Sequence, residues 1–314
     1  MALSTEMILT LQQLDGVGNK TIFKIADQAD THITTMESLC KFWKSLKGKK
    51  LQSITADDLE DAHRVALRII SKCKSEDVGI ISFYESIFPE ILKSCVNEEG
   101  KLDPPILLYY RGNLDVLKKL GIAVIGTREP TRNGILAGKH FSGEFAKRGY
   151  NIVSGLAIGC DTTGHQGALA VGGATTAFLA NGLDWDSIYP KENLDLAKEI
   201  VVKRGLLLSE YPVGQSCGRY GLVARDRLQA GLSYATVVVQ TGVKGGTMHA
   251  VNATIQSKKP LFAVEYKTDE DTSNEKVQGN IKLVKEQKAY ALRSTGIDAV
   301  SYTHLRAHET SLHL

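Results

Sequence analysis

From residue 121 to about residue 266, short apolar runs alternate with longer segments whose apolar residues recur at helical spacing. The apolar runs predict buried strands: Ala123–Ile125, Asn151–Val153, Thr175–Leu179, Leu206–Leu208, Thr236–Val239 and Leu261–Val264. The longer segments predict helices such as Gly134–Arg148, Thr162–Ala170 and Gly246–Ile255. Near-continuous apolar strands that alternate with amphipathic helices favour an α/β fold, a Rossmann-like, mostly parallel sheet with helices on both faces.

The segments outside this alternation have different patterns. Residues 1–76 place apolar side chains near helical spacing and predict a small α-helical domain. Residues 77–120 hold short apolar segments between prolines, which predict a connector with one or two strands leading into the core at 121–300. Within the core, residues 267–276 are polar and predict a loop, whereas residues 279–300 predict a helix and a short strand.

The last fourteen residues, 301–314, fit none of the preceding patterns. They resemble the peptide produced when sequencing-adapter DNA is translated, and we interpret them as a non-native tail. His304 and His308 stand four residues apart, a spacing that can hold a metal on a helix. We favour the tail interpretation, and we expect neither a metal site nor a cofactor.

The composition narrows the class of protein. Hydrophobic residues make up 43% of the chain and charged residues 23%, which is typical of a soluble globular protein. The formal net charge of +3 permits nucleic-acid binding without arguing for it. The five cysteines include no C-x-x-C pair, so we expect reduced thiols in a cytoplasmic protein. The chain starts without a signal-peptide pattern, and no apolar run approaches the roughly 20 residues that cross a bilayer.

Glycine-rich or charged turns follow the predicted strands, where open α/β sheets bind their ligands. Because parallel strands end at one edge, we expect five cations to converge there: Arg128, Lys191, Arg225, Arg227 and Lys244. A Gly-Gly-Thr turn that opens a helix also offers free backbone N–H groups to a phosphate. Each turn alone is consistent with tight packing, and each Arg with a structural ion pair. Together they favour a phosphate-rich ligand.

The turns also carry a resemblance to a known family. In order along the chain they read GTREPT, SGLAIGCDTTGHQGAL, NGLDWDSIYPKEN, LLLSEYP, ARDRLQAGLS and GGTMHA. This series is similar to the DNA-processing protein A (DprA, also called Smf) family over residues 79–300. The resemblance implies a Rossmann-like core that binds single-stranded DNA, loads the RecA recombinase onto it during natural transformation, and forms a homodimer. It implies DNA binding without an enzymatic activity.

The resemblance assigns roles to individual positions. Gly126, Thr127 and Arg128 stand where the family has Gly-Ser-Arg, which grips a backbone phosphate. Lys191, within Tyr-Pro-Lys-Glu-Asn, stands where a family lysine lies in the DNA pocket. The remaining predicted DNA-binding residues are Ser154, Gly155, Asn193, Arg225, Arg227, Lys244, Gly245, Gly246 and Thr247.

Two departures from the family pattern affect this assignment. The family usually has Arg-Asn-Arg where this chain has Arg225-Asp226-Arg227. The negative charge of Asp226 favours local ion pairs, which would weaken a phosphate-binding role for the two arginines. Leu222-Val223 replaces a usual Phe-Pro, so an aromatic surface there is in doubt. Trp185 and Tyr189 can stack bases or pack beneath the third turn.

The N-terminal segment LQQLDGVGNKTIFKIA resembles a helix-hairpin-helix (SAM-like) unit. Its hairpin is Gly16-Val17-Gly18, and Lys20 stands beside it. In such hairpins backbone N–H groups contact a DNA phosphate without reading sequence. Contacts from Gly16, Gly18 and Lys20 and a hairpin kept for packing alone are both open.

Three other functions fit the same fold class. A nucleoside-monophosphate phosphoribohydrolase needs a catalytic Glu after its glycine turn, and Gly245-Gly246-Thr247 has no carboxylate there. Asp161 and Glu210 are possible substitutes, although helix capping and a hydrogen bond at a strand end suit them better. A NAD-binding oxidoreductase needs G-x-G-x-x-G after the first strand, which is missing. A nucleotide-binding protein stays open, because fold alone does not decide function. We expect His165 and His249 to be structural.

Overall fold

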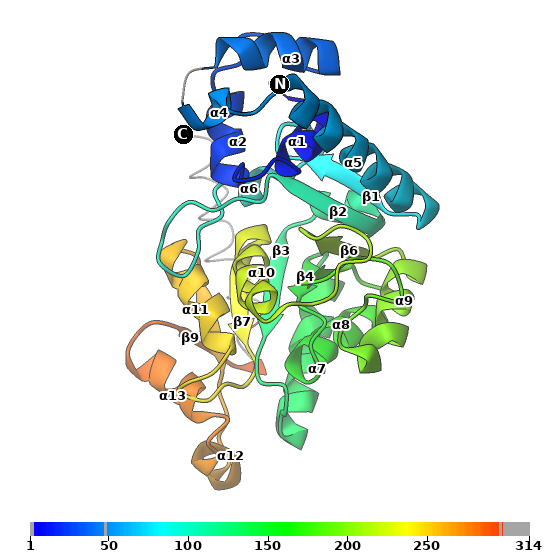
Figure 1. The fold of residues 1–314 in the computed structure, drawn as a ribbon. Helices are drawn as coiled ribbons and strands as arrows, with labels where there is room; N and C mark the ends of the chain where they lie inside the picture. The colour runs from blue at the N-terminus through cyan, green and yellow to red at the C-terminus, as the bar shows by residue number, and fades with distance from the viewer. Residues whose placement is uncertain (1–2, 47–48, 295–296, 298–314) are drawn as a thin grey trace.

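The computed structural model describes residues 3–46, 49–294 and 297, so the predicted tail lies outside the described residues. The chain begins with the predicted helical segment (Figure 1). Its helices are α1 (Thr5–Gln12), α2 (Asn19–Ala26), α3 (Met36–Ser45), α4 (Lys49–Gln52) and α5 (Ala56–Ser75). Thr55 begins α5 with a capping box, in which its hydroxyl accepts from the N–H of Asp58 and the Asp58 carboxylate accepts in return. The apolar faces form one cluster that extends to Ile106 and Leu107 at the start of the sheet.

The described residues form one nine-stranded sheet in the order β1-β2-β6-β5-β4-β3-β7-β8-β9. All pairings from β6 to β9 are parallel, whereas β1 pairs with β2, and β2 with β6, in the antiparallel direction. The strands are β1 (Gly79–Ser82), β2 (Leu107–Gly112), β3 (Gly121–Ile125), β4 (Asn151–Ser154), β5 (Thr175–Leu179), β6 (Leu206–Ser209), β7 (Ser233–Val238), β8 (Leu261–Val264) and β9 (Tyr290–Leu292).

Helices cover both faces of this sheet, as the sequence predicts. In β3, Ile122 and Val124 pack with α7 (Arg132–Lys147) and α8 (Cys160–Ala170). Ala123 and Ile125 alternate with them and pack on the opposite face with α11 (Thr247–Gln256). The other helices are α6 (Glu90–Lys93), α9 (Leu194–Val202), α10 (Arg219–Leu232), α12 (Asp269–Ser273) and α13 (Gln278–Lys285), with short 3-10 turns at Leu114–Lys118 and Lys191–Asn193. The expected Rossmann-like α/β class is confirmed.

Two local predictions were wrong. The segment with Arg225, Asp226 and Arg227 belongs to helix α10 rather than to a loop after β6. Its charged residues mask the helical spacing of Leu228 and Leu232, which are both buried beneath the sheet. The predicted loop at 267–276 contains the short helix α12, whose first turn is capped by the hydroxyl of Thr268. The connector predicted at 77–120 does contain its expected strands, β1 and β2, which pair within the same sheet as the strands of the core.

Residues 298–300 of the predicted core lie outside the described part of the chain. Across the helices of the described ranges, none combines the length and the apolar character needed to cross a bilayer.

Candidate functional site

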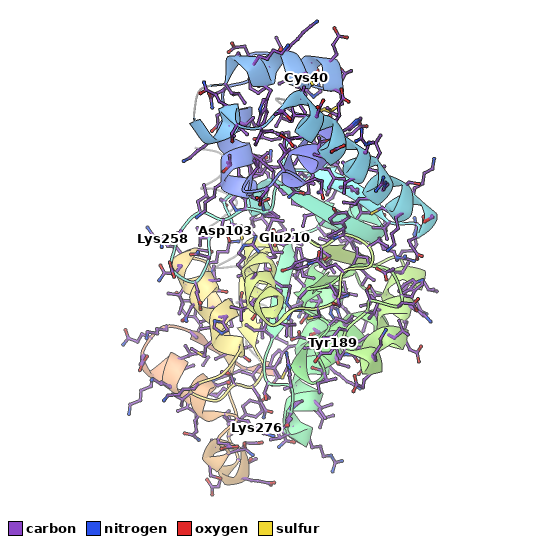
Figure 2. All side chains as sticks on the ribbon, viewed as in Figure 1. Cys40, Asp103, Tyr189, Glu210, Lys258 and Lys276 are labelled. Atoms are coloured by element: carbon purple, nitrogen blue, oxygen red, sulfur yellow. The ribbon has the colours of Figure 1, made fainter. Side chains whose placement is uncertain are left out.

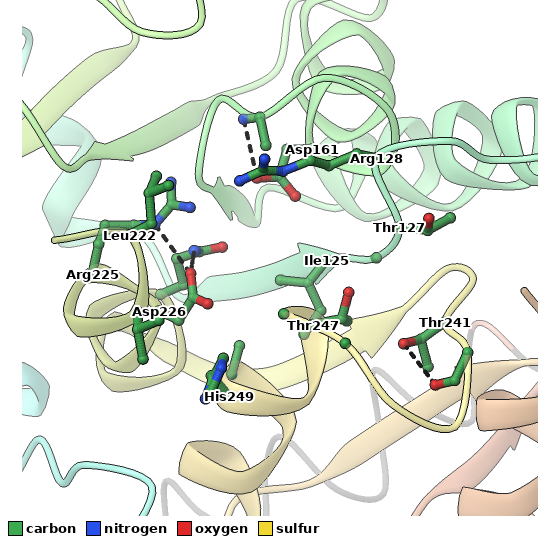
Figure 3. A pocket seen from close by; sticks show the side chains of 18 of the residues that line it. Ile125, Thr127, Arg128, Asp161, Leu222, Arg225, Asp226, Thr241, Thr247 and His249 are labelled. Carbon is green, nitrogen blue, oxygen red and sulfur yellow. Dashed lines mark hydrogen bonds and ion pairs between the residues drawn. The ribbon is translucent and has the colours of Figure 1, made fainter. Parts of the chain in front are cut away.

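A pocket of about 550 Å³ opens at the carboxyl edge of the parallel strands. Its walls come from the turn after β3, the start of α8, one side of α10, and the turn that leads from β7 into α11 (Figure 3). Arg128 and Asp161 lie on one side, and Arg225, Asp226 and His249 lie across from them. This is the edge at which the sequence places its glycine-rich turns, and four segments that are distant in the chain form one hollow there.

The turn after β3 is held rigidly by its neighbours. The N–H of Thr127 donates to the carbonyl of Gln240 at 2.7 Å, and the carbonyl of Thr127 accepts from the N–H of Cys160 at 3.0 Å. A side chain at Gly126 would meet the Sγ of Cys160 at 2.5 Å and the Gln240 carbonyl at 2.7 Å. Only glycine can approach Cys160 and Gln240 this closely, so a side chain at position 126 would displace the backbone that leads to Arg128.

Two exposed cations line the pocket, and neither has a side-chain partner among the described residues. Arg128 and Lys244 have no hydrogen bond or ion pair from their side chains to any residue of the described ranges. Lys244 precedes Gly245, which has φ +139°, and Gly246, which begins helix α11. The N-terminal end of a helix carries unsatisfied N–H groups and partial positive charge. Arg128, Lys244 and the start of α11 therefore present three positive features to one cavity.

Arg225 lies in the pocket wall, but its guanidinium is committed to the protein. It is 6% exposed, and its Nη1 donates to the carbonyls of Phe178, at 2.9 Å, and Gly155. Its Nε donates to the carboxylate of Asp226 at 3.1 Å. This side chain connects α10 to the carboxyl ends of β4 and β5. Arg225 therefore has a structural role and is not an unpaired cation.

The same region contains a buried carboxylate, Asp161, and a largely buried one, Asp226, which sequence reasoning did not place in the pocket. Burial raises the pKa of Asp226 to about 6, and Asp161 adds to this while Arg225 opposes it. Burial also raises the pKa of Asp161 against the opposing charge of Arg225. Asp161 accepts from the N–H groups of Gly155, at 3.1 Å, and Ala157, at 3.2 Å. It therefore holds the loop after β4, beyond the simple helix-capping role that the sequence suggested.

The structure does not bring Arg227 into the pocket. Its guanidinium forms a bidentate ion pair with Glu210, with both hydrogen bonds at 2.8 Å. Its Nε also lies 2.7 Å from a carboxylate oxygen of Asp103. Figure 2 labels these two acidic residues beside each other, and both contact Arg227. Residues two apart on a helix do not share a face, so Arg227 points away from the side that carries Arg225. The expected convergence of all five cations was wrong for Arg227.

Three further predicted residues lie beside the pocket rather than in its wall. Ser154 is fully buried and donates to the carbonyl of Val124 at 2.6 Å. Asn193 is buried and donates to the carbonyl of Leu156 at 2.8 Å. Lys191 is exposed on the neighbouring 3-10 turn, where its Nζ donates to the carbonyl of Asp186. Ser154 and Asn193 hold the loops in place, whereas Lys191 is exposed to solvent and lines neither this pocket nor the adjoining hollow.

The remaining predicted residues divide between lining and packing. Pocket-lining residues include Gly126, Thr127, Arg128, Gly245, Gly246 and Thr247, and Gly155 lines an adjoining hollow.

His165 is buried with its Nδ1 2.7 Å from the hydroxyl of Thr175, and burial lowers its pKa to about 3, as suits a structural histidine. His249 lines the pocket and lies 2.7 Å from a carboxylate oxygen of Glu98. Trp185 packs against the guanidinium of Arg111 at 4.3 Å, whereas Tyr189 is exposed.

The predicted N-terminal hairpin is present between α1 and α2. Gly16 has φ +69°, Gly18 begins α2, and the buried Val17 between them fills the turn. Gly16, Gly18 and Lys20 are exposed, so both interpretations of the hairpin stay open.

Together, these features define a Rossmann-like α/β protein with a cationic hollow at the carboxyl edge of its parallel strands. Residues 79–302 match the model of a family described as DNA recombination-mediator protein A. The chain belongs to this family, which confirms the resemblance seen in its motifs.

Two curated relatives show how much of the chain this likeness covers. The DNA processing protein DprA of Bacillus subtilis (strain 168) is 31% identical over 241 residues, which are 72% of this chain and 78% of that protein. Protein Smf of Synechocystis sp. is 38% identical over 170 residues, which are 53% of this chain and 42% of that protein.

Two solved structures share the architecture. The structure of DprA from Streptococcus pneumoniae has a TM-score of 0.72 and 24% identity, and the match covers 97% of this chain and 99% of that one. The DNA processing protein A of Helicobacter pylori, a structure reported for its unique single-stranded DNA binding mode, has a TM-score of 0.60 and 27% identity. That match covers 72% of this chain and 97% of the other.

Proposed function

We propose that this protein binds single-stranded DNA with backbone phosphates in the pocket, and that it helps a RecA-type recombinase to assemble on the strand. The observation that carries this proposal is that Arg128 and Lys244, whose side chains have no partner in the described part of the chain, line one cavity together with the start of α11. A guanidinium, an ammonium and helix N–H groups are the donors that bind phosphate without reading base sequence. The Helicobacter pylori protein, reported to bind single-stranded DNA, supports the same ligand class.

The arrangement supports binding over bond cleavage. The two residues that sequence reasoning named as possible acids are occupied, Asp161 by two backbone N–H groups and Glu210 by Arg227. A general acid or base has to be within hydrogen-bond reach of the proton it transfers. Incubation with nucleoside monophosphates tests the phosphoribohydrolase alternative directly, and release of free base would overturn the binding-only proposal.

Equilibrium titration tests the main proposal. A labelled single-stranded oligonucleotide and its duplex are titrated with the protein over a series of salt concentrations, using fluorescence anisotropy. We expect tighter binding to the single strand and a log–log salt slope that grows by about 0.7 for each phosphate bound. Equal affinity for both forms, or binding insensitive to salt, would refute the proposal. Lys203→Ala is the matched control, because this exposed lysine lies at the C-terminal end of α9 and does not line the pocket.

The recombinase and oligomer parts of the proposal need separate measurements. Assembly of labelled RecA on an oligonucleotide is followed with and without the protein, and faster assembly is expected only with a pocket that binds DNA. An Arg128→Ala protein that accelerates RecA as well as the wild type would contradict the link between the two. Sedimentation of the free protein tests the proposed homodimer, which a purely monomeric species over the accessible concentrations would exclude.

A further inference from the structure

A second hollow of about 140 Å³ opens beside the cationic pocket. The two cavities share four wall residues, which are Arg128, Ala157, Leu222 and Arg225. Arg128 therefore stands at the boundary between them, and a ligand held by its guanidinium can extend into either space. One extended molecule with an anionic part and a second, different part fits this pair of cavities.

The walls of the second hollow combine apolar side chains with three charged ones, which suits a flat group that has apolar faces and polar edges. Tyr189 is 47% exposed and Ile158 is 41% exposed, and Pro190 and Leu222 complete the apolar surface. An exposed aromatic ring offers a stacking face to any nucleobase. Placed beside a phosphate pocket, such a ring lies where the base of a bound nucleotide would be expected.

A carboxylate at this site argues against a second phosphate. Glu192 lines the hollow and is exposed, and within the described ranges no hydrogen bond or ion pair joins its side chain to another residue. An ionised carboxylate is only an acceptor, so it repels phosphate oxygens and pairs with N–H donors. The exocyclic amino group of cytosine or adenine is such a donor, whereas the O4 oxygen of uracil or thymine is not.

We propose that the second hollow holds the base of a nucleotide whose phosphate lies beside Arg128, and that Glu192 accepts a hydrogen bond from the amino group of that base. This inference rests on the proposed DNA-binding function and adds a base preference to it. Tyr189 supplies the stacking surface, and Glu192 is the specificity-determining residue. The protein then favours cytosine or adenine over uracil or thymine at one position of each bound strand.

Two 15-residue oligonucleotides test this preference, one of deoxycytidine and one of deoxyuridine, because their bases differ at position 4 in the group that meets Glu192. Anisotropy at constant pH and salt should give about five-fold tighter binding of the deoxycytidine strand, the effect of one net hydrogen bond at an exposed rim. Glu192→Gln should bring the affinity ratio close to one, because an amide can accept from cytosine and donate to uracil. Tyr189→Ala should weaken both strands by a similar factor.

Glu199→Gln is the control, because it removes an equal charge from an exposed position on α9, away from both cavities. It should leave the affinity ratio at its wild-type value. Equal affinity of the wild type for the two strands, or a ratio that Glu192→Gln does not move, would overturn the inference. Failure of both strands to bind at low salt would instead overturn the proposed function, so the two failures are distinguishable.

Discussion

Replacement of Asp226 by Asn tests whether the pocket wall contains a negative charge that destabilises the fold. The Asp226 side chain is 15% exposed, and burial raises its pKa from 3.8 to about 6. In the unfolded chain its pKa returns to the ordinary value, so the folded state binds more protons between about pH 4 and pH 6. Stability is therefore highest when Asp226 is protonated, falls as pH rises through this window, and levels off above it.

The size of the effect follows from the two pKa values. The difference between 3.8 and about 6 corresponds to about 3 kcal/mol of unfolding free energy at pH 7.5, and to about half of that at pH 5. Asparagine removes the charge but keeps an oxygen that can accept from the Nε of Arg225 and from Gln229, as Asp226 does at 3.1 and 3.0 Å. We expect Asp226→Asn to raise the free energy of unfolding by up to these amounts.

Urea denaturation followed by circular dichroism at both pH values measures this difference. The control is Asp186→Asn, since Asp186 is an exposed carboxylate in a surface loop. The control should change the free energy of unfolding little at either pH. An Asp226→Asn protein that is no more stable than the wild type at pH 7.5, or whose gain is the same at pH 5, would refute the reasoning.

Three further predictions separate phosphate binding from structural support. Arg128→Ala and Lys244→Ala should each lower the log–log salt slope for single-stranded DNA by about 0.7, which a salt titration of affinity checks. Glu210→Ala should leave that slope unchanged but lower the free energy of unfolding by up to about 3 kcal/mol, because the 7%-exposed Arg227 loses its bidentate pair and keeps only Asp103 as a partner. Affinity for single-stranded DNA should rise between pH 7.5 and 5.5 as Asp226 takes up a proton, and this rise should largely disappear in Asp226→Asn.

The sequence predicted the strands of the parallel sheet because their signal is local. Each is a short apolar run that ends in a glycine or a polar turn, and all six predicted strands are present within two or three residues at their ends. The glycine turns followed from the same pattern, because parallel strands bring their carboxyl ends to one edge. The position of Arg128 and of Gly245-Gly246-Thr247 around one cavity was predictable for this reason.

The sequence predicted an ion pair between Asp226 and a neighbouring arginine, and Arg225 forms it. It could not assign the separate roles of Arg225 and Arg227, because those roles depend on contacts far apart in the chain. When helix α10 is not known, Arg225 and Arg227 are two neighbouring cations that both suit phosphate binding. On the helix they face different elements, the carbonyls of Gly155 and Phe178 for Arg225, and the carboxylate of Glu210 for Arg227. Glu192 and Asp226 were missed as pocket residues for the same reason, since nothing local shows which cavity a carboxylate lines.

The cations that line the pocket therefore have two different roles. Arg225 supports the structure of the wall, whereas Arg128 and Lys244 do not. Arg225 cannot move to meet a phosphate without giving up the carbonyls that it joins and leaving Asp161 and Asp226 as buried, uncompensated charges. A side chain at Gly155 would also meet the carboxylate of Asp161 at 2.7 Å, so the glycine there serves this network as well. Arg128 and Lys244 carry no such duty and stay available to a strand. If DNA binds as proposed, the residues that maintain the shape of the cavity are different from the residues that contact the strand.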